Sequence, residues 1–162
     1  MELLDDFKTG QSDNIPEGIH RALKYMVENF SDELNLDELS EVAQVTKFNL
    51  CRNFRRRYGI PPMRWLWVFR VLLAGEFIKL APDWSLTDIA FTCGFSSSAH
   101  FSRSFSGVMK KSPSSFRRNL TKTTGVGVAN AARKTTYDLM FQDNSKLVSN
   151  AFNRMLTQQY LV

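Results

Sequence analysis

The 162-residue chain is 43% hydrophobic and contains 13 Phe, enough apolar surface for a compact core, which excludes wholesale disorder. It has only two cysteines, no Cys/His spacing suited to zinc, and no apolar run near the roughly 20 residues of a membrane span. Residues 1–45 hold 3 Lys/Arg and 11 Asp/Glu (net −8), whereas residues 46–122 hold 14 and 3 (net +11). The basic middle segment favours an anionic partner, nucleic acid first, with a solvated basic face as the alternative.

The first third predicts an acidic tail and two helices. Residues 1–15 are polar and lack the apolar segment of a signal peptide, which with two unpaired cysteines favours a soluble protein of a reducing cytosol. Pro16 suits the first turn of an amphipathic helix whose apolar residues recur at helical spacing: Ile19, Leu23, Val27 and Phe30. Asn35 and Glu38 form a capping pair that predicts a short helix through Ala43.

The middle of the chain predicts one helix over 47–58 and a longer one over 62–80. Thr46 is placed to cap the first of these, and Gly59 is placed to end it in a left-handed conformation. Pro61 and Pro62 begin the long helix. Its apolar face is wide enough to imply burial on more than one side: Trp65, Leu66, Phe69, Leu72, Leu73, Phe77 and Leu80.

Three further helices are expected downstream. Ser85 and Asp88 form a second capping box for a helix that ends near Gly94, and helices over 97–109 and 113–120 follow. No segment alternates as a strand, so the sequence predicts an all-α fold. Residues 121–162 predict a linker and a C-terminal amphipathic helix over 144–161. That helix packs on the body of the domain or, as the alternative, provides a surface for self-association.

The chain contains an internal repeat. The pattern apolar-x-Arg-x-Phe occurs over Leu50–Phe54 and again over Phe101–Phe105, an offset of 51, and the capped helices upstream match at an offset of 50. In each copy, arginines and small or polar residues lie opposite the apolar face. Arginine on such a face can contact guanine through two hydrogen bonds, whereas neighbouring basic side chains suit phosphates.

At Gly94–Phe105 (GFSSSAHFSRSF), followed by Ser112–Arg117 (SPSSFR), the chain resembles the AraC/XylS family of bacterial transcription regulators. The resemblance covers residues 16–120. It implies two helix-turn-helix units, over about 16–60 and 85–120, that are joined by the linker helix over 62–80. The helices over 47–58 and 97–109 would read successive major-groove segments of double-stranded DNA on one face of the duplex.

The family pattern, carried over residue by residue, implies specific DNA contacts. Base contacts are expected from Phe48, Cys51, Arg52, Ser98, Ala99, His100, Ser102 and Arg103. The basic side chains suited to phosphate contacts are Lys47, Arg55, Arg56, Arg57, Lys110, Lys111, Arg117 and Arg118. RNA polymerase is the expected protein partner, and the resemblance places the protein in the bacterial cytoplasm at the nucleoid.

Several residues leave alternatives open. Gln44 and Lys110 stand where the family often has glycine. Phe48 suits the core as well as a thymine methyl, His100 suits packing at the turn or a phosphate contact as well as a base, and Cys51 would suit oxidation sensing if it were exposed. Trp65 and Trp67 are expected in the core.

The function also has an alternative. Only about 15 residues precede the domain, so the effector domain that most family members carry at the N-terminus is not expected here. This favours, as a second hypothesis, a protein-interaction module that acts on a related regulator or on RNA polymerase. No catalytic grouping, phosphate-binding glycine loop or metal spacing indicates an enzyme, a cofactor or a metal site.

Overall fold

The computed structural model describes residues 16–123, and within this range the chain forms α-helices without strands, which confirms the all-α prediction. The expected tail over 1–15 and the expected helix over 144–161 lie outside the described residues. The elements are α1 (Glu17–Glu28), α2 (Leu36–Ala43), α3 (Lys47–Tyr58), α4 (Pro62–Leu80), α5 (Leu86–Thr92), α6 (Ser98–Met109) and α7 (Pro113–Thr123). α1 begins directly after Pro16, and α7 extends three residues beyond its predicted end.

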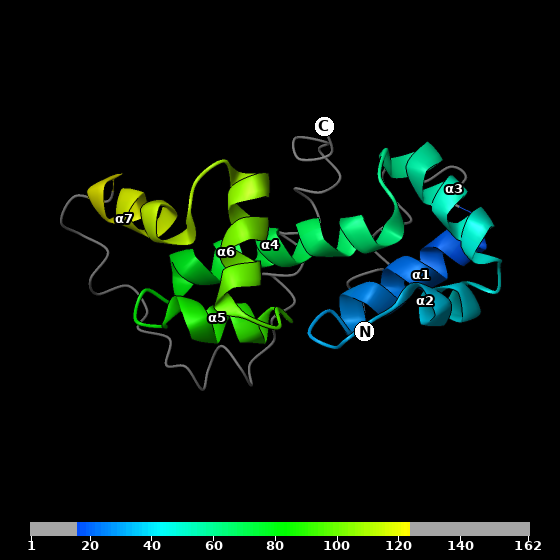
Figure 1. Cartoon of the computed structure of the whole chain (residues 1–162), viewed down its shortest axis with the longest axis horizontal. Helices are drawn as coiled ribbons and strands as arrows, with labels where there is room; N and C mark the ends of the chain where they lie inside the picture. The colour runs from blue at the N-terminus through cyan, green and yellow to red at the C-terminus, as the bar shows by residue number, and fades with distance from the viewer. Residues whose placement is uncertain (1–15, 124–162) are drawn as a thin grey trace.

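The long helix α4 forms the axis of the molecule, with α1–α3 grouped at one end and α5–α7 at the other (Figure 1). Every residue from Val68 to Ile78 is buried, so both groups pack around the same helix. The exception to the predicted apolar face is Leu80, which is 48% exposed. It is the last residue of α4, beyond the buried stretch of the helix, and its assignment to the buried face was wrong.

Short-range hydrogen bonds fix where the helices begin. In each case a cap side chain accepts a hydrogen bond from the backbone N–H three residues later, which pairs a donor that the helix itself leaves unpaired. These caps are Asn35, Thr46, Ser85, Ser97 and Ser112. The predicted caps at Asn35, Thr46 and Ser85 are therefore confirmed, and they set the length of the turn before each helix.

Four left-handed residues confirm the repeat at the level of the backbone. Gln44 (φ 56°) and Gly94 (φ 77°) occupy equivalent turns before α3 and α6, and Gly59 (φ 75°) and Lys110 (φ 55°) end those two helices. Each copy thus has glycine at one of its two left-handed positions and a long side chain at the other. Glycine adopts this conformation without the steric cost of a Cβ atom, so Gln44 and Lys110 carry that cost.

Candidate nucleic-acid interface

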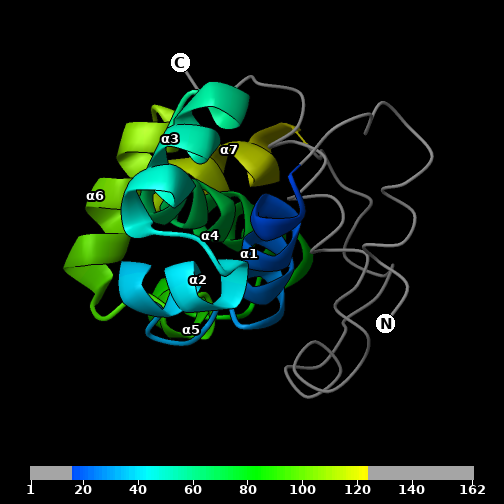
Figure 2. The ribbon, with the colours of Figure 1, turned by 90° about the vertical axis from the view of Figure 1, so that its right-hand side faces the viewer.

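The helices α3 and α6, called here the reader helices, lie on the same side of α4. Figure 2 looks along the long axis of the molecule and shows α6 to the left of α4 and α3 above and to the left of it, whereas α1 lies to its right. The inner face of each reader is anchored in the core through Leu50 and Phe54 in α3 and through Phe101 and Phe105 in α6. The opposite faces of both helices are consequently left available to a partner.

The outward face of α3 carries an exposed aromatic ring beside an arginine. Phe48 is 72% exposed, so it lies outside the core, and the core alternative is excluded. The guanidinium carbon of Arg52 lies 5.7 Å from the centre of the Phe48 ring, within cation–π range. This contact restricts the Arg52 side chain before any ligand arrives. Cys51, which lies between Phe48 and Arg52 in the sequence, is half-buried.

The outward face of α6 is smaller and more polar. Ser98, Ala99, Ser102 and Arg103 are all exposed. The Ser98 hydroxyl is 3.2 Å from the hydroxyl of Thr87 on α5, which links the start of the reader to the preceding helix. Arg103 is therefore the large cationic side chain of this face. The small side chains of Ser98, Ala99 and Ser102 leave room for a DNA groove to approach it.

His100 differs from the other predicted base-contact residues because its ring is half-buried. The ring packs edge-on against Trp67 of α4, with the centroids 4.5 Å apart, and against Phe95, with the centroids 5.5 Å apart. This is the turn-packing role that the sequence left open. Trp65 is fully buried in the core as expected, whereas Trp67 is half-buried beneath His100.

The predicted phosphate contacts fall into three groups. Those with exposed side chains are Arg55, Arg56, Arg57, Lys110, Lys111 and Arg118. Lys47 is exposed but forms an ion pair with Asp37 on α2. Arg117 is half-buried, its Nε and Nη2 have no hydrogen-bond partner within residues 16–123, and burial lowers the pKa of its guanidinium. Arg117 would have to reorient to reach a phosphate.

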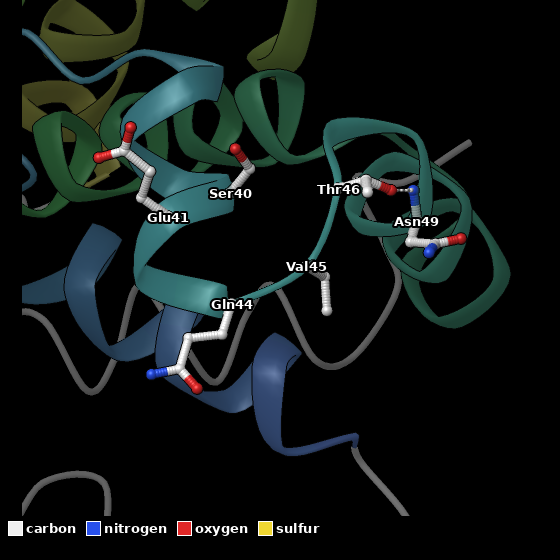
Figure 3. A pocket seen from close by; sticks show the side chains of 6 residues that line it. All are labelled: Ser40, Glu41, Gln44, Val45, Thr46 and Asn49. Carbon is white, nitrogen blue, oxygen red and sulfur yellow. Dashed lines mark hydrogen bonds between the residues drawn. The ribbon is translucent and has the colours of Figure 1, made fainter.

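A hollow of about 550 Å³ opens beside the turn between α2 and α3 (Figure 3). Its lining residues are Ser40, Glu41, Gln44, Val45, Thr46 and Asn49. The one ionisable side chain among them is the carboxylate of Glu41, and the Thr46 hydroxyl already accepts a hydrogen bond from the Asn49 backbone N–H. These six described lining residues therefore offer no positive charge to a phosphate, which distinguishes the hollow from the reader faces.

Comparison with known proteins gives concordant results. A family model described as "Helix-turn-helix domain" matches residues 39–119. The transcriptional activator RhaS of Pectobacterium carotovorum is 32% identical over 111 residues, which cover 68% of this chain and 39% of the relative. The C-terminal domain of AraT, a response regulator from Geobacillus stearothermophilus, is similar in structure, with a TM-score of 0.61 and 27% identity over 67% of this chain and 88% of that one. The chain belongs to the AraC/XylS family.

The family assignment confirms the resemblance seen in the sequence. The DNA-binding domain of AdpA, solved in complex with a target DNA, has the same fold, with a TM-score of 0.64 and 23% identity over 68% of this chain and 99% of that one. Gln44 and Lys110, the departures from the family pattern, keep the left-handed backbone that glycine would adopt. Since this chain spans 39% of the length of RhaS, the match concerns the AraC-type domain alone.

One residue of this AraC-type domain that sequence reasoning missed is Arg70. It lies in the middle of α4, is only 3% exposed, and stacks its guanidinium 4.6 Å from the centre of the Trp67 ring. Nε donates to the Phe30 carbonyl at 2.6 Å, Nη2 to the Asp32 carbonyl at 2.6 Å, and Nη1 to the Gly94 carbonyl at 3.1 Å. Burial lowers the pKa of Arg70, although these partners compensate the charge. An arginine in the middle of the apolar run of α4 was the available signal.

The two thiols have different environments. Cys93 is fully buried next to Arg70, and burial raises the pKa of its thiol well above the ordinary value. Cys51 is partly exposed on the reader α3.

Within residues 16–123, no three His, Cys, Asp or Glu side chains cluster as a metal site would require. In the same range, none of the helices has both the length and the apolar character needed to cross a membrane.

Proposed function

We propose that this chain reads a two-part site in double-stranded DNA, with α3 and α6 in successive major-groove segments on one face of the duplex. The observation that carries the proposal is the placement of both reader helices on the same side of the single helix α4. α4 has 19 residues, which gives a length of roughly 28 Å at 1.5 Å per residue. Successive major-groove segments on one face lie about 34 Å apart, so a connector of this length suits both.

Direct base recognition is assigned to the outward faces of the readers. On α3, Phe48 presents an aromatic surface to a thymine methyl and Arg52 presents a guanidinium to guanine, with Cys51 beside them. On α6, Arg103 has the corresponding role, and Ser98, Ala99 and Ser102 allow close approach to base edges. His100 contributes to base recognition through the position of its backbone and ring at the start of α6.

Affinity that does not depend on sequence is assigned to the basic residues around the readers. Arg55, Arg56 and Arg57 follow the base-contact positions of α3, and Lys110, Lys111 and Arg118 follow those of α6. Side chains of this type neutralise phosphates and release counterions. Lys47 and Arg117 join this group after Lys47 leaves Asp37 and Arg117 reorients. The helix α2 carries Asp37, Glu38 and Glu41 and no basic side chain, so it would not face the duplex.

For the whole protein we propose regulation of transcription, as the name of the RhaS relative states for that protein. RNA polymerase is the proposed protein partner, and the nucleoid within the bacterial cytoplasm is the proposed location. Self-association through residues 144–161, outside the described range, stays a prediction. The proposal assigns no catalytic step to any residue.

The test is selection of bound sequences from a random duplex library, followed by gel-shift titration of the selected site. Arg103→Ala should weaken binding by about 1–3 kcal/mol and relax the base preference at one position, whereas Arg56→Ala should weaken binding to all sequences equally and reduce the salt slope by about 1. Arg64→Ala, at an exposed arginine of α4, is the matched control. A chain that shows no salt-sensitive binding to any duplex would refute the proposed function.

A further inference from the structure

Arg70 lies where the two helix-turn-helix units meet. Two of its three carbonyl partners, Phe30 and Asp32, belong to the segment between α1 and α2, and the third, Gly94, belongs to the turn between α5 and α6. A single guanidinium therefore joins three segments from both ends of the molecule. We call this contact between the two units, made by Phe30–Asp32, Arg70 and Gly94, the joint.

Apart from α4 itself, the described part of the chain has few helix-to-helix contacts between the two units. The helices α1–α3 pack on one another and on α4, and α5–α7 do the same, but no helix of one group packs extensively on a helix of the other. At the joint the backbones approach closely, because a Cβ atom added to Gly94 would lie 2.8 Å from the Phe30 carbonyl oxygen and 2.9 Å from that of Ser31. The relative angle of the units thus depends on few contacts.

We propose that Arg70 is a positioning residue that sets the angle between the two reader helices, and that the protein thereby measures the spacing between the two halves of its DNA site. The second half of this proposal rests on the proposed function, whereas the first concerns the chain alone.

The chemistry of arginine suits this role and that of lysine does not. The guanidinium is planar and rigid and has five N–H donors, so it can hold three carbonyls in fixed directions at once. A lysine ammonium is a compact point charge on a flexible stem, and a methionine side chain has no donor. Arg70→Lys should therefore keep a buried charge and the fold but lose the fixed directions, and Arg70→Met should lose all three hydrogen bonds.

A fixed angle matters for DNA because spacing and rotation are coupled in a duplex. With about 10–10.5 base pairs per turn, each inserted base pair rotates the second half-site by about 34° around the axis. A rigid pair of readers then loses the base contacts of one helix, and each good contact is worth about tenfold in affinity. A hinged pair would follow the rotation and lose much less.

The first experiment measures the angle without DNA. Nitroxide labels are placed at Arg57→Cys on α3 and Gly107→Cys on α6, in a Cys51→Ser background, and their distance distribution is measured by pulsed electron resonance. Gly107 is exposed with no atom within 4 Å of an added Cβ, and the buried Cys93 thiol should not be labelled. We expect a narrow distribution in the parent and a broader one in Arg70→Lys and Arg70→Met. Unchanged widths in both variants would overturn the assignment of Arg70.

The second experiment measures spacing on the selected DNA site, with one or two base pairs inserted or deleted between its halves. The parent should lose about tenfold or more per changed base pair, and Arg70→Lys should flatten this profile to within about threefold. Arg64→Met, at an exposed arginine of the same helix, should keep the parental profile. A variant profile parallel to that of the parent would overturn the spacing role. Failure of the parent to bind any duplex would refute the proposed function instead and leave the label distances to decide on Arg70.

Discussion

Replacement of Gly94 by alanine should destabilise the domain more than its backbone conformation alone predicts. The residue has φ of +77°, which costs an alanine roughly 1–2 kcal/mol. The added Cβ would also lie 2.8 and 2.9 Å from two carbonyl oxygens of the backbone, which cannot move aside as the end of a side chain could. The segment must shift and stretch the hydrogen bonds from Arg70, each worth about 1 kcal/mol. We expect a total loss of about 3–4 kcal/mol.

The free energy of unfolding is measured by urea denaturation, followed by the helical circular dichroism signal. Two other glycines provide controls. Gly59→Ala introduces the same left-handed strain at an exposed position, and should cost about 1–2 kcal/mol. Gly107→Ala lies within α6 in open space, and should stabilise by about 0.5–1 kcal/mol. If Gly94→Ala lost no more stability than Gly59→Ala, the close approach of the two units would not exist in solution.

Three further predictions follow from single side chains. Burial holds the Cys93 thiol protonated in the folded state, whereas the thiol of the unfolded chain loses its proton above its ordinary pKa of 9.0. The free energy of unfolding should therefore fall by up to about 1.4 kcal/mol per pH unit above that pKa. A series of urea denaturations from pH 8 to 10.5 measures this fall. Phe48→Ala should weaken DNA binding, and a site with uracil in place of the contacted thymine should abolish the difference between variant and parent in gel shifts. Asp37→Asn should release Lys47 to contact a phosphate, which should raise DNA affinity by about two- to fivefold and make its dependence on salt steeper in titrations. An unchanged affinity and salt dependence would contradict the proposed phosphate contact of Lys47.

The elements that the sequence predicts well are those that depend on neighbours in the chain. The caps at Asn35, Thr46 and Ser85 each bond a backbone N–H three residues away, so their geometry requires no knowledge of the rest of the fold. The same holds for Gly59 at the end of α3, because the left-handed backbone needed there favours glycine whatever the rest of the fold. The wide apolar face of α4 likewise predicted burial on several sides, because a helix at the centre of two units has few positions that reach solvent.

The features that the sequence did not predict depend on segments far apart in the chain. Arg70 bonds carbonyls 24 to 40 residues away, and an arginine in an amphipathic pattern ordinarily indicates a surface position. Lys47 has the composition of a phosphate contact, but its pairing with Asp37 requires the arrangement of α2 against α3. The side-chain role of His100 was ambiguous because Trp67, which packs against its ring, lies on another helix.

The joint also explains why the two copies of the repeat differ in their turns. At the second turn, Gly94 satisfies two requirements, a left-handed backbone and contact with the other unit, so no side chain fits. At the first turn, Gln44 is exposed and meets only the backbone requirement, which a longer residue tolerates at a modest cost. The close approach there falls instead on α1, where a Cβ atom added to Gly18 would lie 2.7 Å from the Ala43 carbonyl oxygen. The duplicated units therefore keep the same backbone path but place the glycine required by packing in different elements, the turn before α6 in one unit and α1 in the other, because only one of the two turns lies at the joint.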